Sequence, residues 1–410
     1  MVIIRSPSQG QTNLNRGVLV DGRLSNHYLK LLLKQLDFSS TLLMIIALFA
    51  SFVIHPSSAL NILQGNDDGW AECNIRTLYK VLKQRGHQTI ISAPVRNKSG
   101  TGSRSTEWTP LREPGEYDTV PVGAPGVGHD PADPRVWYVN AFPLDGIRFG
   151  LETLTARFYG GMPDLIVTGP NVGKNTGLQD RFSGTLGAAA FGSRQGVTAI
   201  AISADDDNRH GYQTGDSEEK SSEIYAKATM RVLDEFILKM ENTAEGPPND
   251  FVVPAGCVLN INLQRAGPQT DCRSAHDYRF VLTTIFGIRH QSGINHCGSP
   301  FLPGEQAVLD SPNGCWAAVT LIQSHSFLDG SSEQKQALLD RAPEFFSCPA
   351  EDGLLKKELG PEMGVDSGTE TLPSFNNPSR EEQSDVKDDD DDDDDKEEKR
   401  LYFQPGNISG

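Results

Sequence analysis

Two adjacent carboxylates follow the first buried strand that the sequence predicts. Leu60–Leu63 reads as a short apolar strand, and Asn66–Gly69 (Asn-Asp-Asp-Gly) comes just after it. Two carboxylates side by side at the end of a buried strand are unfavourable unless another group compensates their charge. A hard divalent cation does so, because it prefers carboxylate, amide and hydroxyl oxygens. An ordinary turn is the alternative, since Asn-Asp and Asp-Gly both favour turns.

Two further polar clusters follow later predicted strands. Asn97–Thr106 is a loop of hydroxyl groups and glycines that can approach a phosphate or a metal closely, although a merely flexible loop would have the same composition. Asn171 and Asn175 follow the strand near 164–168, and their amides offer an oxygen to a metal or N–H donors to a phosphate. Ser183-Gly184-Thr185 opens a predicted helix, where free backbone N–H groups attract anions or where Ser183 is an ordinary N-cap.

Strands and helices alternate through the middle of the chain. The expected strands cover residues 60–63, 88–92, 136–139, 164–168 and 197–203. The expected helices cover residues 71–85, 145–159, 185–194 and 222–240. Continuous apolar strands that alternate with helices indicate an α/β domain, with a parallel sheet covered by helices on both faces. A smaller β-rich section follows, with strands near 258–263, 279–286 and 317–322, whereas the Pro- and Gly-rich stretch 110–134 is expected to lack regular structure.

The three polar clusters all fall at the carboxyl ends of predicted strands. Ligands of open parallel sheets bind beyond these ends, so we expect the clusters to converge on one site. A dinucleotide-dependent oxidoreductase is disfavoured, because no Gly-x-Gly-x-x-Gly follows the first strand.

Charge is concentrated at the end of the chain. Of the net charge of −17, residues 351–400 contribute −12 through 19 acidic and 7 basic side chains, which leaves −5 for the rest. Residues 388–395 are eight consecutive aspartates, and such a tract repels itself, so 351–410 is predicted to be an acidic disordered tail. No basic stripe for a nucleic-acid polymer is present, and the expected partner is a small phosphorylated molecule.

The N-terminal segment 1–59 is interpreted as a leader. Residues 41–54 form an apolar run of signal-peptide length, followed by Ser57-Ser58-Ala59, which suits a cleavage site. The run is short for a membrane span, so no stable membrane insertion is expected after processing. The roughly 40 residues before it are long for a signal peptide, and an uncleaved anchor or a buried helix are the alternatives. We therefore expect a secreted, secretory-pathway or vacuolar protein.

The six cysteines include no Cys-x-x-Cys pair, which disfavours a zinc ribbon or a thioredoxin-like site. In the oxidising compartment that a signal peptide implies, some of them should form disulfides. Cys73 lies in the first predicted helix and is expected to be a buried thiol.

Taken together, these clusters resemble the SurE family of survival-protein nucleotidases and acid phosphatases. The family pattern is Asn-Asp-Asp-Gly, Ser-Gly-x-Gly-x-Ser-x-Thr, Ser-Gly-x-Asn-x-Gly-x-Asn and Ser-Gly-Thr-x-Gly-Ala-Ala in that order. The corresponding segments here are Asn66–Gly69, Ser99–Thr106, Thr168–Asn175 and Ser183–Ala189, with a looser match at Val139–Gly146. The likeness predicts a SurE-like domain over residues 60–330, from a secreted eukaryotic member of fungal type.

The resemblance implies the roles of individual residues. It implies Mg²⁺ or Mn²⁺ held by Asp67, Asp68, Ser99 and Asn171. It implies a phosphate bound by Asn175, Ser183, Gly184 and Thr185. Asp67, Asn175 and Ser183 are then the expected catalytic residues. Asp67 or Asp68 would take a proton from the attacking water, and Asn175 and Ser183 would stabilise the phosphoryl charge. The family also implies hydrolysis of nucleoside monophosphates or other phosphomonoesters, a Rossmann-like core and a homodimer.

Some residues depart from the family pattern. Ala141-Phe142 replaces Gly-Thr, which suggests a different pocket for the base or leaving group. Asn97-Lys98-Ser99 is a glycosylation sequon, which we expect to be unmodified because a glycan there would block the site. The alternative to an enzyme is a secreted protein that keeps the fold and binds nucleotide without turnover.

Overall fold

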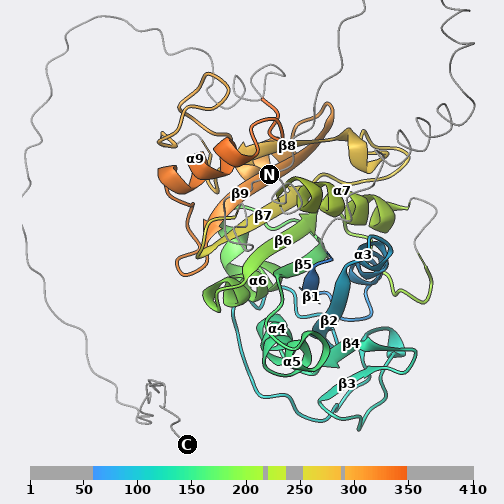
Figure 1. Cartoon of the computed structure of the whole chain (residues 1–410). Coiled ribbons are helices and arrows are strands. Elements are labelled where there is room, and N and C mark those ends of the chain that lie inside the picture. The colour runs from blue at the N-terminus through green and yellow to red at the C-terminus, as the bar shows by residue number, and fades with distance from the viewer. Residues whose placement is uncertain (1–58, 216–219, 237–252, 288–290, 349–410) are drawn as a thin grey trace, which may run out of the picture. The chain divides into compact units, whose positions relative to one another are not determined.

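The computed structural model describes residues 59–215, 220–236, 253–287 and 291–348, all within one compact unit (Figure 1). Residues 1–58, predicted to be a leader, residues 237–252, and residues 349–410, predicted to include an acidic tail, lie outside the described residues, so these expectations stay predictions. Among the described residues, no helix is long and apolar enough to cross a membrane.

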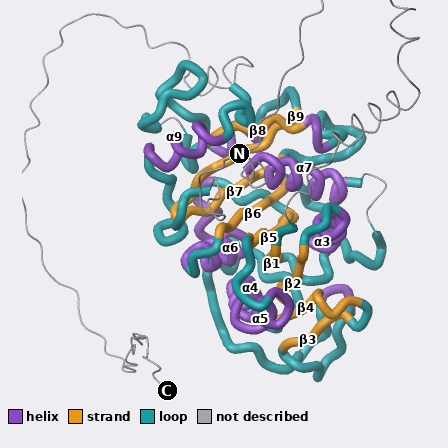
Figure 2. The backbone as a smooth tube through the Cα atoms, viewed as in Figure 1, coloured by secondary structure: helices purple, strands orange, loops and turns teal. Residues whose placement is uncertain are grey.

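A single sheet of nine strands runs through the described part of the chain, in the order β3-β4-β2-β1-β5-β6-β7-β9-β8 (Figures 1 and 2). The strands are β1 Asn61–Gly65, β2 Gln88–Pro94, β3 Val127–Asp130, β4 Asp133–Val139, β5 Leu165–Val172, β6 Thr198–Ala204, β7 Cys257–Leu263, β8 Tyr278–Thr283 and β9 Cys315–Gln323. The six strands from β4 to β7 are parallel. Their carboxyl ends therefore meet at one edge.

Helices cover both faces of the sheet, as predicted. The described α-helices are α3 Cys73–Gln84, α4 Pro143–Phe149, α5 Thr155–Tyr159, α6 Gly184–Arg194, α7 Ser221–Phe236, α8 Glu305–Leu309 and α9 Ser332–Arg341. Successive strand residues face opposite sides, so Ile62 packs into a core with α3 and α7, whereas Leu63 packs into another with α4 and α6.

The β-rich C-terminal part is joined to the main sheet. β9 pairs antiparallel with β7, and β8 pairs parallel with β9 at the edge. The folded core extends beyond residue 330. Helix α9 follows, and its residues Leu338 and Leu339 pack into this core.

Two expectations about local structure were wrong. The stretch 110–134 contains a short 3₁₀ turn, Glu116–Asp118, and the edge strand β3, which forms an antiparallel pair with β4. The predicted helix 145–159 is interrupted, since a π-helical turn, Gly150–Leu154, separates α4 from α5.

Two disulfides, Cys272–Cys315 and Cys297–Cys348, lie in the C-terminal part. Each closes a long loop, which stabilises the fold mainly by restricting the unfolded chain. Cys73 and Cys257 are buried and lie outside these disulfides, so the expectation that Cys73 is a buried thiol is confirmed.

Candidate active site

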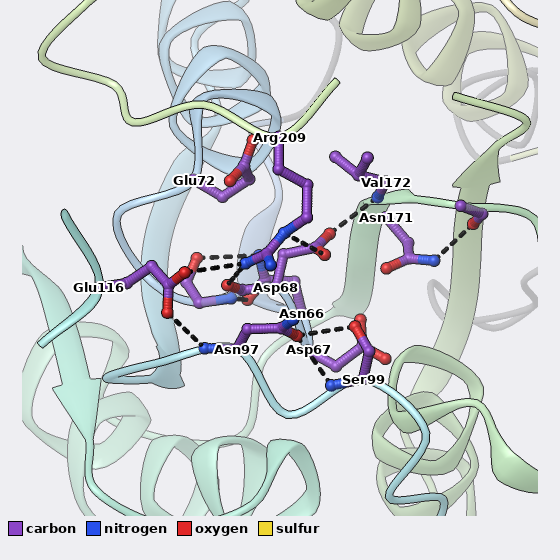
Figure 3. Close-up of polar contacts among 12 residues, drawn as sticks. Asn66, Asp67, Asp68, Glu72, Asn97, Ser99, Glu116, Asn171, Val172 and Arg209 are labelled. Atoms are coloured by element: carbon purple, nitrogen blue, oxygen red, sulfur yellow. Dashed lines mark hydrogen bonds and ion pairs between the residues drawn. The ribbon is translucent and has the colours of Figure 1, made fainter. Parts of the chain in front are cut away.

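A tight turn after β1 presents the two acidic residues. The Asn66 side chain closes this turn, because its Nδ2 donates to the Gly69 carbonyl (3.0 Å) and its Oδ1 accepts from the Gly69 N–H (3.2 Å). Gly69 has φ +118°, a conformation that other residues rarely adopt. Asn66 and Gly69 thus serve to close the turn, and the side chains of Asp67 and Asp68 lie beside it (Figure 3).

Asp67 is held by the N-terminus of α6. The Thr185 hydroxyl donates to Asp67 Oδ1 (2.6 Å), and the Thr185 N–H donates to Oδ2 (3.2 Å). Gly184 permits this approach, since a Cβ there would lie 2.8 Å from the Asp67 Cβ. Burial raises the pKa of Asp67, and the bonds to Thr185 oppose this shift.

The contacts of Thr185 differ from the role that the resemblance implied. We expected Gly184 and Thr185 to bind the phosphate, but both Thr185 donors are directed at Asp67. Their direct binding of phosphate stays a prediction, whereas the geometry gives them a clear part in fixing the carboxylate.

Asp68 is fully buried and lacks sufficient hydrogen-bond donors. The Val172 N–H donates to its Oδ2 (2.8 Å), but Oδ1 has no hydrogen-bond partner among the described residues. Arg209 Nε lies 3.5 Å from that oxygen, as an ion pair only. Burial, reinforced by the charge of Asp67, raises the pKa of Asp68 well above its usual range. More positive charge is needed to keep both carboxylates ionised.

Asn171, at the end of β5, adds another oxygen. Its Nδ2 donates to the Gly173 carbonyl (2.5 Å), which fixes the orientation of the amide. The Asn171 Oδ1 is buried without a hydrogen-bond partner among the described residues, and it faces the side of the acidic pair (Figure 3). Asp67, Asp68 and Asn171 thus fit a hard divalent cation, because two buried oxygens lack donors and the donor set is the one that Mg²⁺ and Mn²⁺ prefer.

Ser99 lies on the loop that borders this pair. The Lys98 N–H donates to the Asp67 carbonyl (2.7 Å), which ties the loop to the turn. The Ser99 hydroxyl donates to Asn97 Oδ1 (2.7 Å), so its oxygen keeps lone pairs for a cation, and its role as a ligand stays a prediction.

The same loop is anchored at its far end. Buried Asp145 at the start of α4 accepts from the Ser105 hydroxyl (2.5 Å) and the Thr106 N–H (2.9 Å). Gly187 lets the loop pass over α6, since a Cβ there would lie 2.5 Å from the Gly102 carbonyl oxygen. The loop is consequently held in place and is not merely flexible.

Asn175 and Ser183 flank a 3₁₀ segment, η3 Gly177–Phe182. Ser183 caps α6, because its Oγ accepts from the Leu186 N–H (2.9 Å), and its hydroxyl hydrogen remains able to donate. Asn175 Nδ2 donates to Ser203 Oγ (2.7 Å), which occupies one of its two amide hydrogens. Both residues therefore retain a donor for a phosphate, and their predicted role stays open to test.

Sequence reasoning missed Arg209. Besides its ion pair with Asp68, Arg209 Nη2 donates to the Asp68 carbonyl (3.2 Å) and to Glu116 Oε1 (3.1 Å). Arg209 follows β6 by five residues. The expectation that ligands bind beyond the carboxyl ends of parallel strands, which located the other clusters, would also have pointed to it. Among the described residues, Arg209 thus supplies positive charge next to the buried Asp68 carboxylate.

Comparison with known proteins places this site in a family. The model of the family "Survival protein SurE" matches residues 62–285, which cover the whole site. An acid phosphatase of Yarrowia lipolytica is 31% identical over 319 residues, 71% of this chain and 87% of the relative. A 5'-nucleotidase SurE of Synechocystis is 34% identical over 150 residues, 36% of this chain and 49% of the relative.

Another 5'-nucleotidase SurE, of Caldanaerobacter subterraneus, is 30% identical over 204 residues, half of this chain and 65% of the relative. The crystal structure of a SurE protein from Aquifex aeolicus aligns with 65% of this chain and 94% of its own at a TM-score of 0.42 and 21% identity. On the family match and the long alignment with the fungal phosphatase, this chain belongs to the SurE family.

Proposed function

We propose that this protein is a divalent-metal-dependent phosphomonoesterase that hydrolyses nucleoside monophosphates. The observation that carries the proposal is the buried Asp67–Asp68 pair with the orphaned oxygens Asp68 Oδ1 and Asn171 Oδ1 at the strand ends. Family membership supports the reaction class, since relatives of this chain are named acid phosphatase and 5'-nucleotidase.

Asp67, Asp68 and Asn171 would hold the cation, with Ser99 as the further candidate ligand. A bound Mg²⁺ or Mn²⁺ supplies Lewis-acid stabilisation of the phosphate charge. Thr185 and the Val172 N–H keep the two carboxylates in a fixed orientation, and Arg209 offsets part of their charge.

Proton transfer and charge stabilisation fall to three residues. Each Asp67 oxygen accepts from Thr185 and keeps another lone pair, so this carboxylate can take the proton of the attacking water. The Ser183 hydroxyl and the second amide hydrogen of Asn175 would donate to the phosphoryl oxygens as charge develops. Water is the preferred nucleophile, because among the described residues no histidine hydrogen-bonds to Ser183.

The assembly and location of the protein are further parts of this proposal. The two disulfides suit the oxidising environment of the secretory route, secreted or vacuolar. The resemblance to the family supports a homodimer. Protein sequencing of the mature N-terminus and light scattering of the purified chain test these two points directly.

The activity test uses the full chain with nucleoside monophosphates and p-nitrophenyl phosphate, in Mg²⁺, Mn²⁺ or EDTA. We expect cation-dependent phosphate release that is lost in Asp67→Asn and kept in Asp340→Asn, which alters an exposed carboxylate of α9. A folded, cation-loaded protein that binds nucleotide but releases no phosphate would instead support the binding-protein function.

A further inference from the structure

A second pair of buried carboxyl groups lies outside the cation site. Asp180 belongs to η3, the segment between Asn175 and Ser183, and is 1% exposed. Glu305 is the first residue of α8 and is completely buried. The two residues come from distant parts of the sequence and meet under the segment that leads into the active site.

One amide bridges the two carboxyl groups. Asn260 Nδ2, on β7, lies 3.1 Å from Glu305 Oε1 and 3.4 Å from Asp180 Oδ1. Because a single amide nitrogen lies within reach of both carboxyl groups, Asp180 and Glu305 lie next to each other, and a proton on one of them would let it donate to the other. Asp180 Oδ2 is buried without another donor among the described residues, and a proton there would satisfy it.

The same groups hold the segment that carries Asn175. The Gly177 N–H donates to Glu305 Oε2 (2.9 Å), and the Thr176 hydroxyl donates to Gln306 Oε1 (2.9 Å). Asn260 Nδ2 also lies 3.4 Å from the Asn175 carbonyl oxygen. Asn175, the start of η3 and Asp180 are thus all fastened to one buried polar cluster.

We propose that Asp180 and Glu305 are a positioning pair, in which a shared proton locks the segment 175–182 so that Asn175 and Ser183 face the cation site. The proposal rests on the proposed function, because it assigns a purpose to the placement of two phosphate-binding residues. Neither carboxyl group touches the reacting atoms. Loss of the proton leaves two buried negative charges that repel, and the segment then loosens.

The surroundings of the pair favour retention of the proton at neutral pH. Burial raises the pKa of Asp180 to about 10, helped by the charge of Glu305. Burial raises the pKa of Glu305 to about 7, against hydrogen bonds from Thr320 and Gly177.

Two other charged groups face the pair. Asp329, after β9, adds negative charge and raises the pKa of Asp180 further. Lys335 on α9 lies 3.7 Å from Asp329 and offsets part of that charge. The net charge of these groups remains negative, and the shared proton would neutralise part of it.

The proton can be observed directly in the full chain loaded with Mg²⁺. Infrared spectra at pH 8 should contain the C=O band of a protonated carboxylic acid, distinct from carboxylate bands. We expect this band to disappear in Asp180→Asn and Glu305→Gln and to persist in Asp310→Asn, an exposed acid at the end of α8. Its absence from the unsubstituted protein, or its persistence in both variants of the pair, would overturn the shared proton.

Hydrogen exchange of the peptide 175–183 tests the positioning. Asp180→Ala should raise its exchange rate by about tenfold, equivalent to about one lost hydrogen bond. Asp180→Asn should restore protection, because its amide can donate permanently to Glu305. Protection that is the same in Asp180→Ala and the unsubstituted chain would refute the role, and Glu305→Ala gives the same test if Asp180→Ala does not fold.

Activity provides a separate readout. The unsubstituted enzyme should lose kcat/KM in the alkaline range as the pair gives up its proton, whereas Asp180→Asn should keep it. If kcat/KM fell identically in the alkaline range for both proteins, the pair would not control the pH dependence of activity. If the infrared and exchange results are as expected but no substrate is hydrolysed, the positioning pair stands and the proposed phosphomonoesterase function fails.

Discussion

Two pairs of buried carboxyl groups share the same residue chemistry but have different neighbours. Asp67 and Asp68 lie at strand ends beside Arg209, and an oxygen of Asp68 and one of Asn171 lack donors. Asp180 and Glu305 both lie within reach of the amide of Asn260. We propose that the first pair holds a cation and that the second shares a proton. Burial alone therefore does not define a metal site; the arrangement of oxygens and donors around the carboxylates does.

The largest expected effect concerns the first pair, because only this pair is proposed to bind a cation. Asp68→Asn should lower kcat/KM by about a thousandfold, because loss of a cation that stabilises transition-state charge removes several kcal/mol. In EDTA the same variant should melt higher than the unsubstituted chain, since it removes one of two repelling buried carboxylates. Phosphate release and thermal melts with Mg²⁺ or EDTA check both points, with Asp340→Asn as the control. An Asp68→Asn protein of full activity would contradict the assignment.

A smaller effect is expected at the residue that orients Asp67. Thr185→Val keeps the side-chain shape and the N–H bond but removes the hydroxyl bond of 2.6 Å. A hydrogen bond to a charged group is worth about 1.5–3 kcal/mol, so kcat/KM should fall by roughly 10- to 100-fold. Thr185→Ser, which retains the hydroxyl, should recover most of the activity in steady-state assays. Equal activity in both variants would show that the N–H bond alone positions Asp67.

Arg209→Lys keeps the positive charge near Asp68 but loses the forked contact with Glu116 and the Asp68 carbonyl. We expect kcat/KM to fall by about tenfold and the Mg²⁺ concentration at half-maximal activity to rise, because the turn is less firmly held. Titration of activity with Mg²⁺ measures both. A variant that needs less Mg²⁺ would mean that Arg209 competes with the cation.

The smallest expected effect concerns stability of the second pair. The pKa of Asp180 is about 10 in the folded chain, above its ordinary value of 3.8, so the folded state binds more protons between these values. Stability contributed by this group is therefore present at acidic pH and declines as pH rises toward 10. Asp180→Asn should melt a few degrees higher than the unsubstituted chain at pH 8, with little difference near pH 4. A melting advantage that does not depend on pH would contradict a retained proton.

The strands of the sheet differed in how clearly the sequence predicted them. The apolar strands β1, β5 and β6 were predicted because they are buried on both faces and read as continuous hydrophobic runs. The edge strand β3, Val-Gly-His-Asp, has no such run and is stabilised by pairing with β4. Its position in a Pro- and Gly-rich stretch concealed it, since tertiary context and not local preference decides edge strands.

The sequence by itself determined the parallel sheet, the clustering of Asp67, Asp68, Asn171, Asn175 and Ser183 at strand ends, and the family. These follow from local pattern, because parallel strands bring their carboxyl ends to one edge. Only the tertiary structure decided that Thr185 holds Asp67, that Arg209 reaches Asp68, and that Glu305 meets the segment before Ser183. These contacts join residues more than a hundred positions apart, and hydrogen bonding depends on distance and direction in space, which sequence spacing does not specify.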